Sequence, residues 1–178
     1  MENKQPSAFA SSISPGIIIG AVLIVFSLIL FLLDVDHESF LNYISYALLA
    51  VGLWWAINSY KKKLDGGFIS YGTAFSAGFY AGLVASVIVA IYLYFYVLKI
   101  NPGMIDEILL KAEEQMLDRN PDMTDEQIEQ GLSLIQKIYS PGMFSVFGFI
   151  INVIASALIS LIIAIFAKRE NTGFNSAE

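Results

Sequence analysis

The 178-residue chain is 56% hydrophobic and only 15% charged, with a mean hydropathy of +0.65. Soluble domains carry about 25% charged residues, so this composition predicts one domain that is solvated largely by lipid. The chain has no cysteine, which excludes disulfides, thiolate metal sites and cysteine nucleophiles. The net charge is −6 and no basic stripe occurs, so we expect no nucleic-acid binding.

Four uncharged apolar runs follow one another along the chain, and each approaches or exceeds the roughly 20 helical residues that span a bilayer. They cover residues 15–33, 40–60, 72–98 and 143–167. An acidic turn follows the first run where a signal peptide would have small residues, which favours an uncleaved helix. The second run ends in Trp54, Trp55 and Tyr60 before three lysines, a pattern typical of a membrane interface. We predict an all-α fold, with residues 1–178 forming a single four-helix transmembrane bundle.

Lysine and arginine in the short flanks of these runs predict the orientation. One set of flanks contains six of them: Lys4, Lys61, Lys62, Lys63, Lys168 and Arg169. On the opposite side, residues 34–39 contain none, and residues 99–142 contain four basic and nine acidic residues, a net charge of −5. We therefore expect both termini in the cytoplasm and the acidic segment outside.

Residues 99–142 are predicted to form an extracytoplasmic hairpin of two amphipathic helices. Thr124 and Gln127 have the spacing of a capping box, which predicts the start of the second helix. Other helix ends are marked by Asn101 with Pro102, by Asn120 with Pro121, and by Ser140, Pro141 and Gly142. The apolar stripes of the two helices fold onto each other or onto the membrane surface, and the sequence leaves both possibilities open.

One stretch of this hairpin resembles a calcium-binding loop. The ligand positions of such a loop correspond to Asp118, Asn120, Asp122, Thr124, Glu126 and Glu129. Met123 stands where the sharp turn of the loop needs a glycine, and the capping box begins a helix inside the loop. We favour an acidic, well-capped hairpin over a calcium site, and we expect neither a metal nor a cofactor.

Small residues recur at every fourth position in the third and fourth runs, a spacing that puts them on one helix face. These candidate helix-packing residues are Ala74, Gly78, Gly82, Ser86 and Ala90 in the third run, and Gly148, Asn152, Ser156 and Ser160 in the fourth. Gly16 and Gly20 form a shorter ridge in the first run. Because membrane helices associate by close packing and interhelical hydrogen bonds, we expect these ridges to be packing surfaces, within one chain or between chains.

The sequence lacks the residues on which most catalysis and ion transport depend. It has no phosphate-binding or dinucleotide-binding glycine motif, and its only histidine, His37, lies in an acidic turn without a partner for zinc. No ionisable residue lies inside an apolar run, whereas ion-coupled carriers normally need such groups at membrane depth. We expect a non-enzymatic membrane component that binds lipid, a partner membrane protein or a second copy of itself. The alternative is a small channel or carrier for an uncharged solute, with Asn152 on its pathway.

Three short motifs are similar to those of a known family: LDGGFISYGTAF at residues 64–75, YSPGMF at 139–144 and AKR at 167–169. They resemble the domain of unknown function 4199 family of bacterial membrane proteins, found mainly in Bacteroidota. The resemblance implies four spans with a polar helical segment between the third and fourth, in the bacterial inner membrane. It implies no activity and no functional residues.

Overall fold

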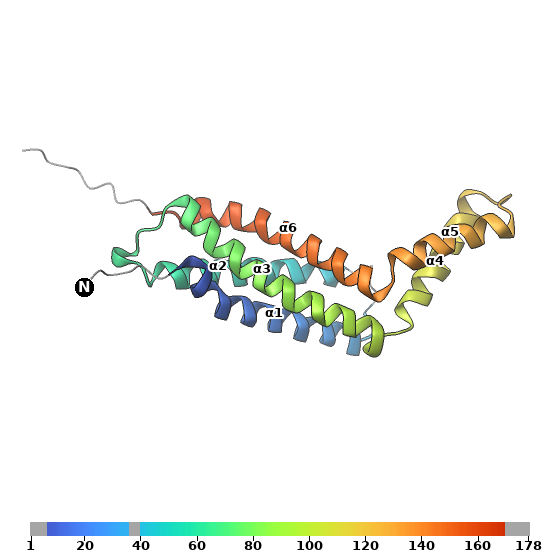
Figure 1. Ribbon diagram of the computed structural model, residues 1–178, viewed down its shortest axis with the longest axis horizontal. Helices are drawn as coiled ribbons and strands as arrows, with labels where there is room; N and C mark the ends of the chain where they lie inside the picture. The colour runs from blue at the N-terminus through green and yellow to red at the C-terminus, as the bar shows by residue number, and fades with distance from the viewer. Residues whose placement is uncertain (1–6, 36–39, 170–178) are drawn as a thin grey trace, which may run out of the picture. The chain divides into compact units, whose positions relative to one another are not determined.

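A computed structural model describes residues 7–35 and 40–169, and within them the fold is all-α (Figure 1). The helices are α1 (Ala8–Leu32), α2 (Ile44–Lys61), α3 (Tyr71–Phe95), α4 (Met104–Arg119), α5 (Asp125–Ile138) and α6 (Pro141–Ala167). Short 3-10 turns cover Phe40–Tyr43 and Asp65–Gly67, and a π-helical turn covers Tyr96–Ile100. The predicted positions of Lys4 and His37 lie outside the described residues.

Three helices are long and apolar enough to cross a membrane: α1, α6, and α3 together with its π-helical turn. They contain 25, 27 and 30 residues, so at about 1.5 Å per residue each exceeds the roughly 30 Å hydrocarbon core. Helix α2 has 18 residues and is not among them. Its last turn contains Asn58, Ser59 and Lys61, which lower its hydropathy. The all-α prediction is confirmed, with helices suited to a membrane in three of the four expected places.

Helix boundaries in the 99–142 segment agree with the prediction at three ends and differ at one. Helix α4 ends before Asn120, and α5 begins after Thr124 with both capping-box hydrogen bonds present. Helix α6 begins at Pro141. The predicted helix start at Asn101 is wrong, because α4 begins at Met104 without a side-chain cap. The Asn101 N–H instead donates to the Tyr96 carbonyl oxygen at 2.8 Å, which closes the preceding π-helical turn.

Helix α1 begins seven residues before the apolar run that predicted it, so that Pro15 lies inside the helix. Its C-terminal end has a Schellman motif, in which the Asp34 N–H donates to the Phe31 carbonyl oxygen and the Val35 N–H to that of Leu30. Asp34 takes the left-handed conformation of this motif, with φ of 53°. The acidic turn expected after the first span therefore begins directly at the end of α1.

The chain divides into two compact units, Met1–Val89 with Ile151–Glu178 and Ala90–Ile150. In the first unit, the core surrounds the small-residue face of α3. The buried residues on this face are Ala74, Ala77, Gly78, Ala81, Gly82, Ala85 and Ser86. Larger side chains come from the neighbouring helices, among them Ile19, Leu49, Leu53, Ile57 and Ile163. Because α3 contributes almost no side-chain volume, its backbone lies close to three other helices.

A tight turn joins α2 to α3 in the first unit and also holds the end of α6. Gly66 and Gly67 have φ values of 67° and 65°, the left-handed region that glycine adopts without strain. After them, the backbones of Ile69 and Arg169 exchange two hydrogen bonds of 3.0 and 2.9 Å. The Ile69 side chain is 2% exposed. This turn therefore joins the start of α3 to the end of α6.

In the second unit, α4 packs against α5, so the predicted apolar stripes face each other. Ile128 of α5 is buried, and a Cβ placed on Gly131 would lie 2.7 Å from the Met116 Cε of α4. Several large apolar side chains of this hairpin remain exposed, namely Leu110, Leu117, Leu134 and Ile138. The two helices thus cover only part of their apolar surface.

Candidate functional site

A close helix contact in the first unit joins α3 to α6 at two glycine–serine pairs. A Cβ placed on Gly82 would lie 2.3 Å from the Ser156 Cβ, and one on Gly78 would lie 2.7 Å from the Ser160 Oγ. Real Cβ atoms do not approach other atoms so closely. Gly82 therefore requires glycine, whereas a Cβ at Gly78 would be accommodated if the Ser160 hydroxyl and the Ile57 side chain shifted. The structure brings together these four predicted packing residues. We call them the α3–α6 seam.

The same two glycines also contact α2. The Ile57 Cδ1 lies 2.8 Å from the Cβ position of Gly78, and the Leu53 Cδ2 lies 3.5 Å from that of Gly82. Leu53, Ile57 and both serines of the seam are essentially inaccessible to solvent. The seam is therefore filled from one side by serines of α6 and from the other by branched side chains of α2.

Helix α1 packs on the adjacent face of α3 through its own small residues. A Cβ on Gly16 would lie 2.6 Å from the Val84 Cβ, and one on Gly20 would lie 3.1 Å from the Ile88 Cβ. One turn before Gly16, the Ser12 hydroxyl donates to the Ala77 carbonyl oxygen at 2.9 Å. Sequence analysis missed Ser12 because it lies outside the apolar run. The signal that could have identified Ser12 is its position four residues before Gly16, the same spacing as between Gly16 and Gly20.

The hydroxyls of Ser156 and Ser160 are buried without a hydrogen-bond partner within the described structure. A buried serine can bond the carbonyl of its own preceding turn, as Ser86 does with Gly82 at 2.7 Å. The Ser156 and Ser160 Oγ atoms instead lie 2.5 and 2.7 Å from the Cβ positions of their partner glycines. A glycine Cα–H bond points along this direction, so each seam pair has the arrangement of a weak Cα–H···O contact.

The remaining predicted packing residues lie in different surroundings. Ala74 and Ser86 are buried on α3, and Asn152 is half-buried on α6. In the second unit, the Ala90 carbonyl oxygen accepts a 2.6 Å hydrogen bond from the Ser145 hydroxyl. There, too, a Cβ on Gly148 would lie 2.5 Å from the Leu93 Cδ1. Every predicted small residue is thus at least half-buried, and most contact a neighbouring helix.

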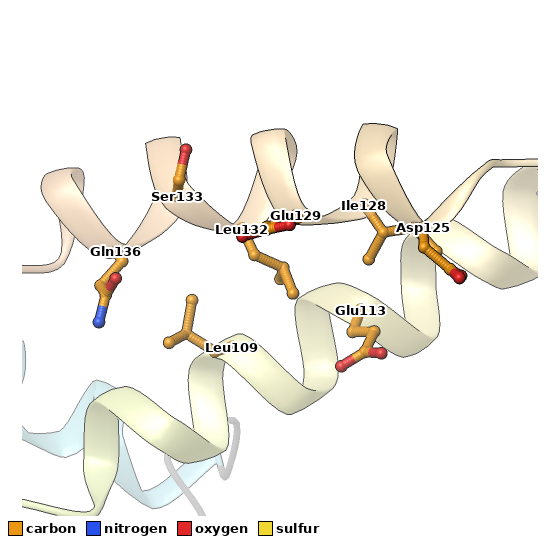
Figure 2. Close-up of a pocket in the computed structure, with 8 residues that line it drawn as sticks. All are labelled: Leu109, Glu113, Asp125, Ile128, Glu129, Leu132, Ser133 and Gln136. Atoms are coloured by element: carbon orange, nitrogen blue, oxygen red, sulfur yellow. The ribbon is translucent and has the colours of Figure 1, made fainter.

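The α4–α5 hairpin contains an open groove, shown in Figure 2, with a volume of about 480 Å³. Leu109 of α4 and Ile128 and Leu132 of α5 point into the space between the helices. The polar residues that line the groove are Glu113, Asp125, Glu129, Ser133 and Gln136. An apolar centre with three carboxylates around it can accommodate an apolar side chain flanked by cations. We call it the hairpin groove.

One residue of the calcium-like pattern in the hairpin serves as a helix cap. Among the described residues, no group of three or more Asp, Glu or His side chains is arranged to hold a metal ion. The Thr124 hydroxyl accepts a hydrogen bond from the Gln127 N–H at 3.4 Å, and the Gln127 side chain accepts one from the Thr124 N–H at 3.1 Å. The residue at position 7 of the hypothetical calcium loop is therefore used to cap α5.

Comparison with known proteins identifies a family for the chain but no activity. The family model described as Protein of unknown function (DUF4199) matches residues 15–169. No curated protein and no solved structure matches the chain. The matched region contains the whole α3–α6 seam and the whole hairpin groove, but not Ser12.

Proposed function

The chain belongs to the DUF4199 family of proteins of unknown function, and from its geometry we propose that it is a non-enzymatic component of the bacterial inner membrane that binds a partner through its hairpin groove. One observation carries this proposal. The small-residue faces are filled by contacts within the chain, whereas the apolar surface of the hairpin is only partly covered. The hairpin is therefore the surface that still has room for a partner protein.

Four spans, with both termini in the cytoplasm and the hairpin outside, are part of the proposal. The contacts of α2 support its role as the second span, although it is shorter and less apolar than the others. It packs on α1 where Gly52 meets Ile19, and it ends where the Lys61 Nζ donates to the Ala167 carbonyl oxygen at 2.8 Å. Helical structure also continues on its N-terminal side through Phe40–Tyr43. Helix α2 thus runs beside helices that are themselves long enough to span.

The chemistry of the hairpin groove indicates what the partner presents. Leu110 and Leu117 are 62% and 38% exposed and lie three residues before and four residues after Glu113, so they share its side of α4. These two leucines add exposed apolar surface beside Glu113, next to the apolar centre of the groove. The partner segment that fits this surface is amphipathic, with apolar side chains that fill the groove and lysine or arginine beside them.

Site-specific photo-crosslinking in the native host tests this function. A photoreactive residue placed at Leu110, Glu129 or Gln136 should crosslink to the same protein. Glu129 and Gln136 line the groove, and Leu110 lies one turn from Glu113 on α4. Gln115 is an exposed position on another face of α4 and serves as the matched control. Crosslinks from Gln115 that equal those from the groove, or none from any position, would contradict the proposal.

A second arm tests the electrostatic part of the proposal. Replacing Glu113 and Glu129 with glutamine keeps the shape of the groove but removes two of its three carboxylates. Exposed ion pairs contribute up to about 1 kcal/mol each, so the crosslink yield from Leu110 should fall several-fold and become less sensitive to salt. An unchanged yield would mean that the partner is not recognised by its charge.

A further inference from the structure

Two basic segments that are distant in the sequence lie together at the end of the first unit where α2 and α6 finish. They contain Lys61, Lys62, Lys63, Lys168 and Arg169. The Lys61 Nζ donates to the Ala167 carbonyl oxygen at 2.8 Å, and the backbones of Ile69 and Arg169 exchange two hydrogen bonds. These contacts hold the two basic segments together, so their proximity is built into the fold. We call these five residues the basic cluster.

Not all of the cluster is used for these internal contacts. Lys61 caps α6, and the Arg169 guanidinium lies over the Phe68 ring, 5.5 Å from its centroid. Lys62, Lys63 and Lys168 are exposed. In sequence, the cluster adjoins only two acids, Asp65 and Glu170, so its net charge is +3. The cluster thus presents a local excess of positive charge.

The cluster lies directly beside apolar surface of the kind that faces acyl chains. The last two turns of α6 before Lys168 expose Ile162, Ile165 and Phe166, with Phe166 73% exposed. On α2, Trp54 and Trp55 are 46% and 44% exposed and precede Lys61 and Lys62 by seven residues, so each tryptophan shares a helix face with a lysine two turns later. A ligand that matches this arrangement has a negative head and a long apolar tail.

We propose that the basic cluster is a binding site for the phosphate headgroup of an anionic phospholipid whose acyl chains lie against α6 and the end of α2. The exposed lysines supply the charge, and Arg169, held by its backbone and by Phe68, supplies a fixed fork of donors for a phosphate. This proposal does not depend on the partner of the hairpin groove. It commits to a lipid headgroup because a soluble phosphate would make no use of the adjoining apolar surface.

The two tryptophans of the chain make a native probe for this site. They lie about 10 Å from the cluster along α2, at a depth that upper acyl-chain carbons reach. The full-length protein is reconstituted in vesicles in which either phosphatidylglycerol or phosphatidylcholine is brominated on these carbons. Quenching of tryptophan fluorescence then reports which lipid lies next to α2. We expect stronger quenching by brominated phosphatidylglycerol at equal mole fraction, which indicates several-fold local enrichment.

Variants that remove the charge of the exposed lysines are compared with variants that keep it, so that an effect on lipid binding can be told from an effect on folding. Each exposed lysine contributes about five-fold to the attraction of an anionic lipid, so replacing Lys62, Lys63 and Lys168 with glutamine should remove most of the enrichment. Replacing the same lysines with arginine should preserve it, and glutamine at Lys99 and Lys137 should leave it unchanged. Equal helicity by circular dichroism shows that each variant is folded.

Two outcomes would overturn the proposal. Equal quenching by the two brominated lipids in the unaltered protein would show that no anionic lipid is enriched at this end. Loss of enrichment in about 10 mM inorganic phosphate at constant ionic strength would show that the cluster binds a soluble anion in place of a lipid. Enrichment that survives phosphate and is lost in the glutamine variant would support the lipid site.

Discussion

Gly82 and Ser156 lie so close together that the type of each residue determines whether α3 and α6 can pack. A Cβ added at Gly82 would meet the Ser156 Cβ, which is fixed to the backbone of α6 and cannot rotate away. At Gly72, near the start of α3, no atom lies within 4 Å of the same position. Alanine favours a helix more than glycine does at both positions, but only at Gly82 would its methyl group meet another helix. Comparing the two substitutions therefore separates the effect of steric packing from that of helix preference.

Replacing Gly82 with alanine should therefore lower the free energy of unfolding by about 1–3 kcal/mol, the usual cost of overpacking. Gly72→Ala should be neutral or stabilising by up to about 1 kcal/mol, because alanine favours a helix. Denaturation by SDS in detergent micelles, followed by circular dichroism, measures both changes. Equal effects at the two positions would show that Gly82 does not contact α6.

A second substitution at the seam should rescue the first. Ser156→Gly removes the Cβ and the hydroxyl that the new methyl group would meet. The double variant Gly82→Ala with Ser156→Gly should be more stable than Gly82→Ala alone, with a coupling energy of about 0.5–3 kcal/mol in the double-mutant cycle. Strict additivity would mean that the two residues do not touch.

Among the elements, α3 and the α4–α5 hairpin use glycine in different ways. In α3, Gly78 and Gly82 meet short serine side chains and the backbone of α3 approaches α6. In α5, Gly131 meets only the flexible end of Met116, whose Cε lies 2.7 Å from the added Cβ. A methionine can rotate away from a new methyl group at little cost, so glycine is required less strictly at position 131 than at Gly82.

Gly131→Ala should accordingly be tolerated in the hairpin. We expect a change between no effect and about 1 kcal/mol of added stability, because the gain in helix preference offsets the shift of Met116. Hydrogen exchange of the α4 and α5 amides in the full-length protein measures this locally. Faster exchange throughout both helices would show that Met116 cannot move and that the hairpin is packed as tightly as the seam.

The sequence predicted some elements better than others for physical reasons. Proline and a capping box each act on their own segment, so the end of α5 before Ser140 and its start after Thr124 were predicted from local chemistry. The fourth span was predicted from Met143, and α6 begins two residues earlier, at Pro141. Asn101 was misassigned because it could equally well end one helix or start the next, and only the tertiary path selects between them. The small-residue spacing identified Gly78 and Gly82 but did not pair them with Ser160 and Ser156. A repeat along one helix shows which residues share a face, but not which residues of another helix that face contacts.

For the whole molecule, the contacts at one end of the first unit constrain how the chain crosses a membrane. Lys61 bonds the end of α6 and Ser12 bonds the Ala77 carbonyl near the start of α3. The start of α1, the end of α2, the start of α3 and the end of α6 therefore lie on the same side of the first unit. If the chain crosses the membrane an even number of times, these four helix ends lie on one side of the membrane. The basic residues that flank them then lie on that side too, as the positive-inside rule requires.

Reporter fusions test this arrangement in cells. Fusions at Asp65 and after Glu178 should behave as cytoplasmic, and a fusion at Arg119 should behave as periplasmic. The expected pattern follows from six basic residues in one set of flanks and a net charge of −5 in residues 99–142. A periplasmic signal from Asp65 would overturn the proposed orientation and with it the location of the hairpin groove.

We infer that the α3–α6 seam closes within one chain and leaves the hairpin for a partner. Because the chain has no native cysteine, a single introduced pair can test it. A Cβ on Gly78 would lie 3.1 Å from the Ser160 Cβ, so Gly78→Cys with Ser160→Cys needs only a small shift to reach the roughly 3.5–4.5 Å of a disulfide. The exposed pair Val87→Cys with Leu158→Cys serves as the control.

The measurement is oxidation of this double variant in the membrane, followed by cleavage at a protease site inserted after Asn120 and by non-reducing electrophoresis. We expect the two halves of a single chain to stay joined at the mass of a monomer and to separate when reduced. The halves of the control variant should separate under both conditions. A disulfide-linked dimer, or halves that separate without reduction, would contradict this inference, because the seam would then lie between chains or not form at all.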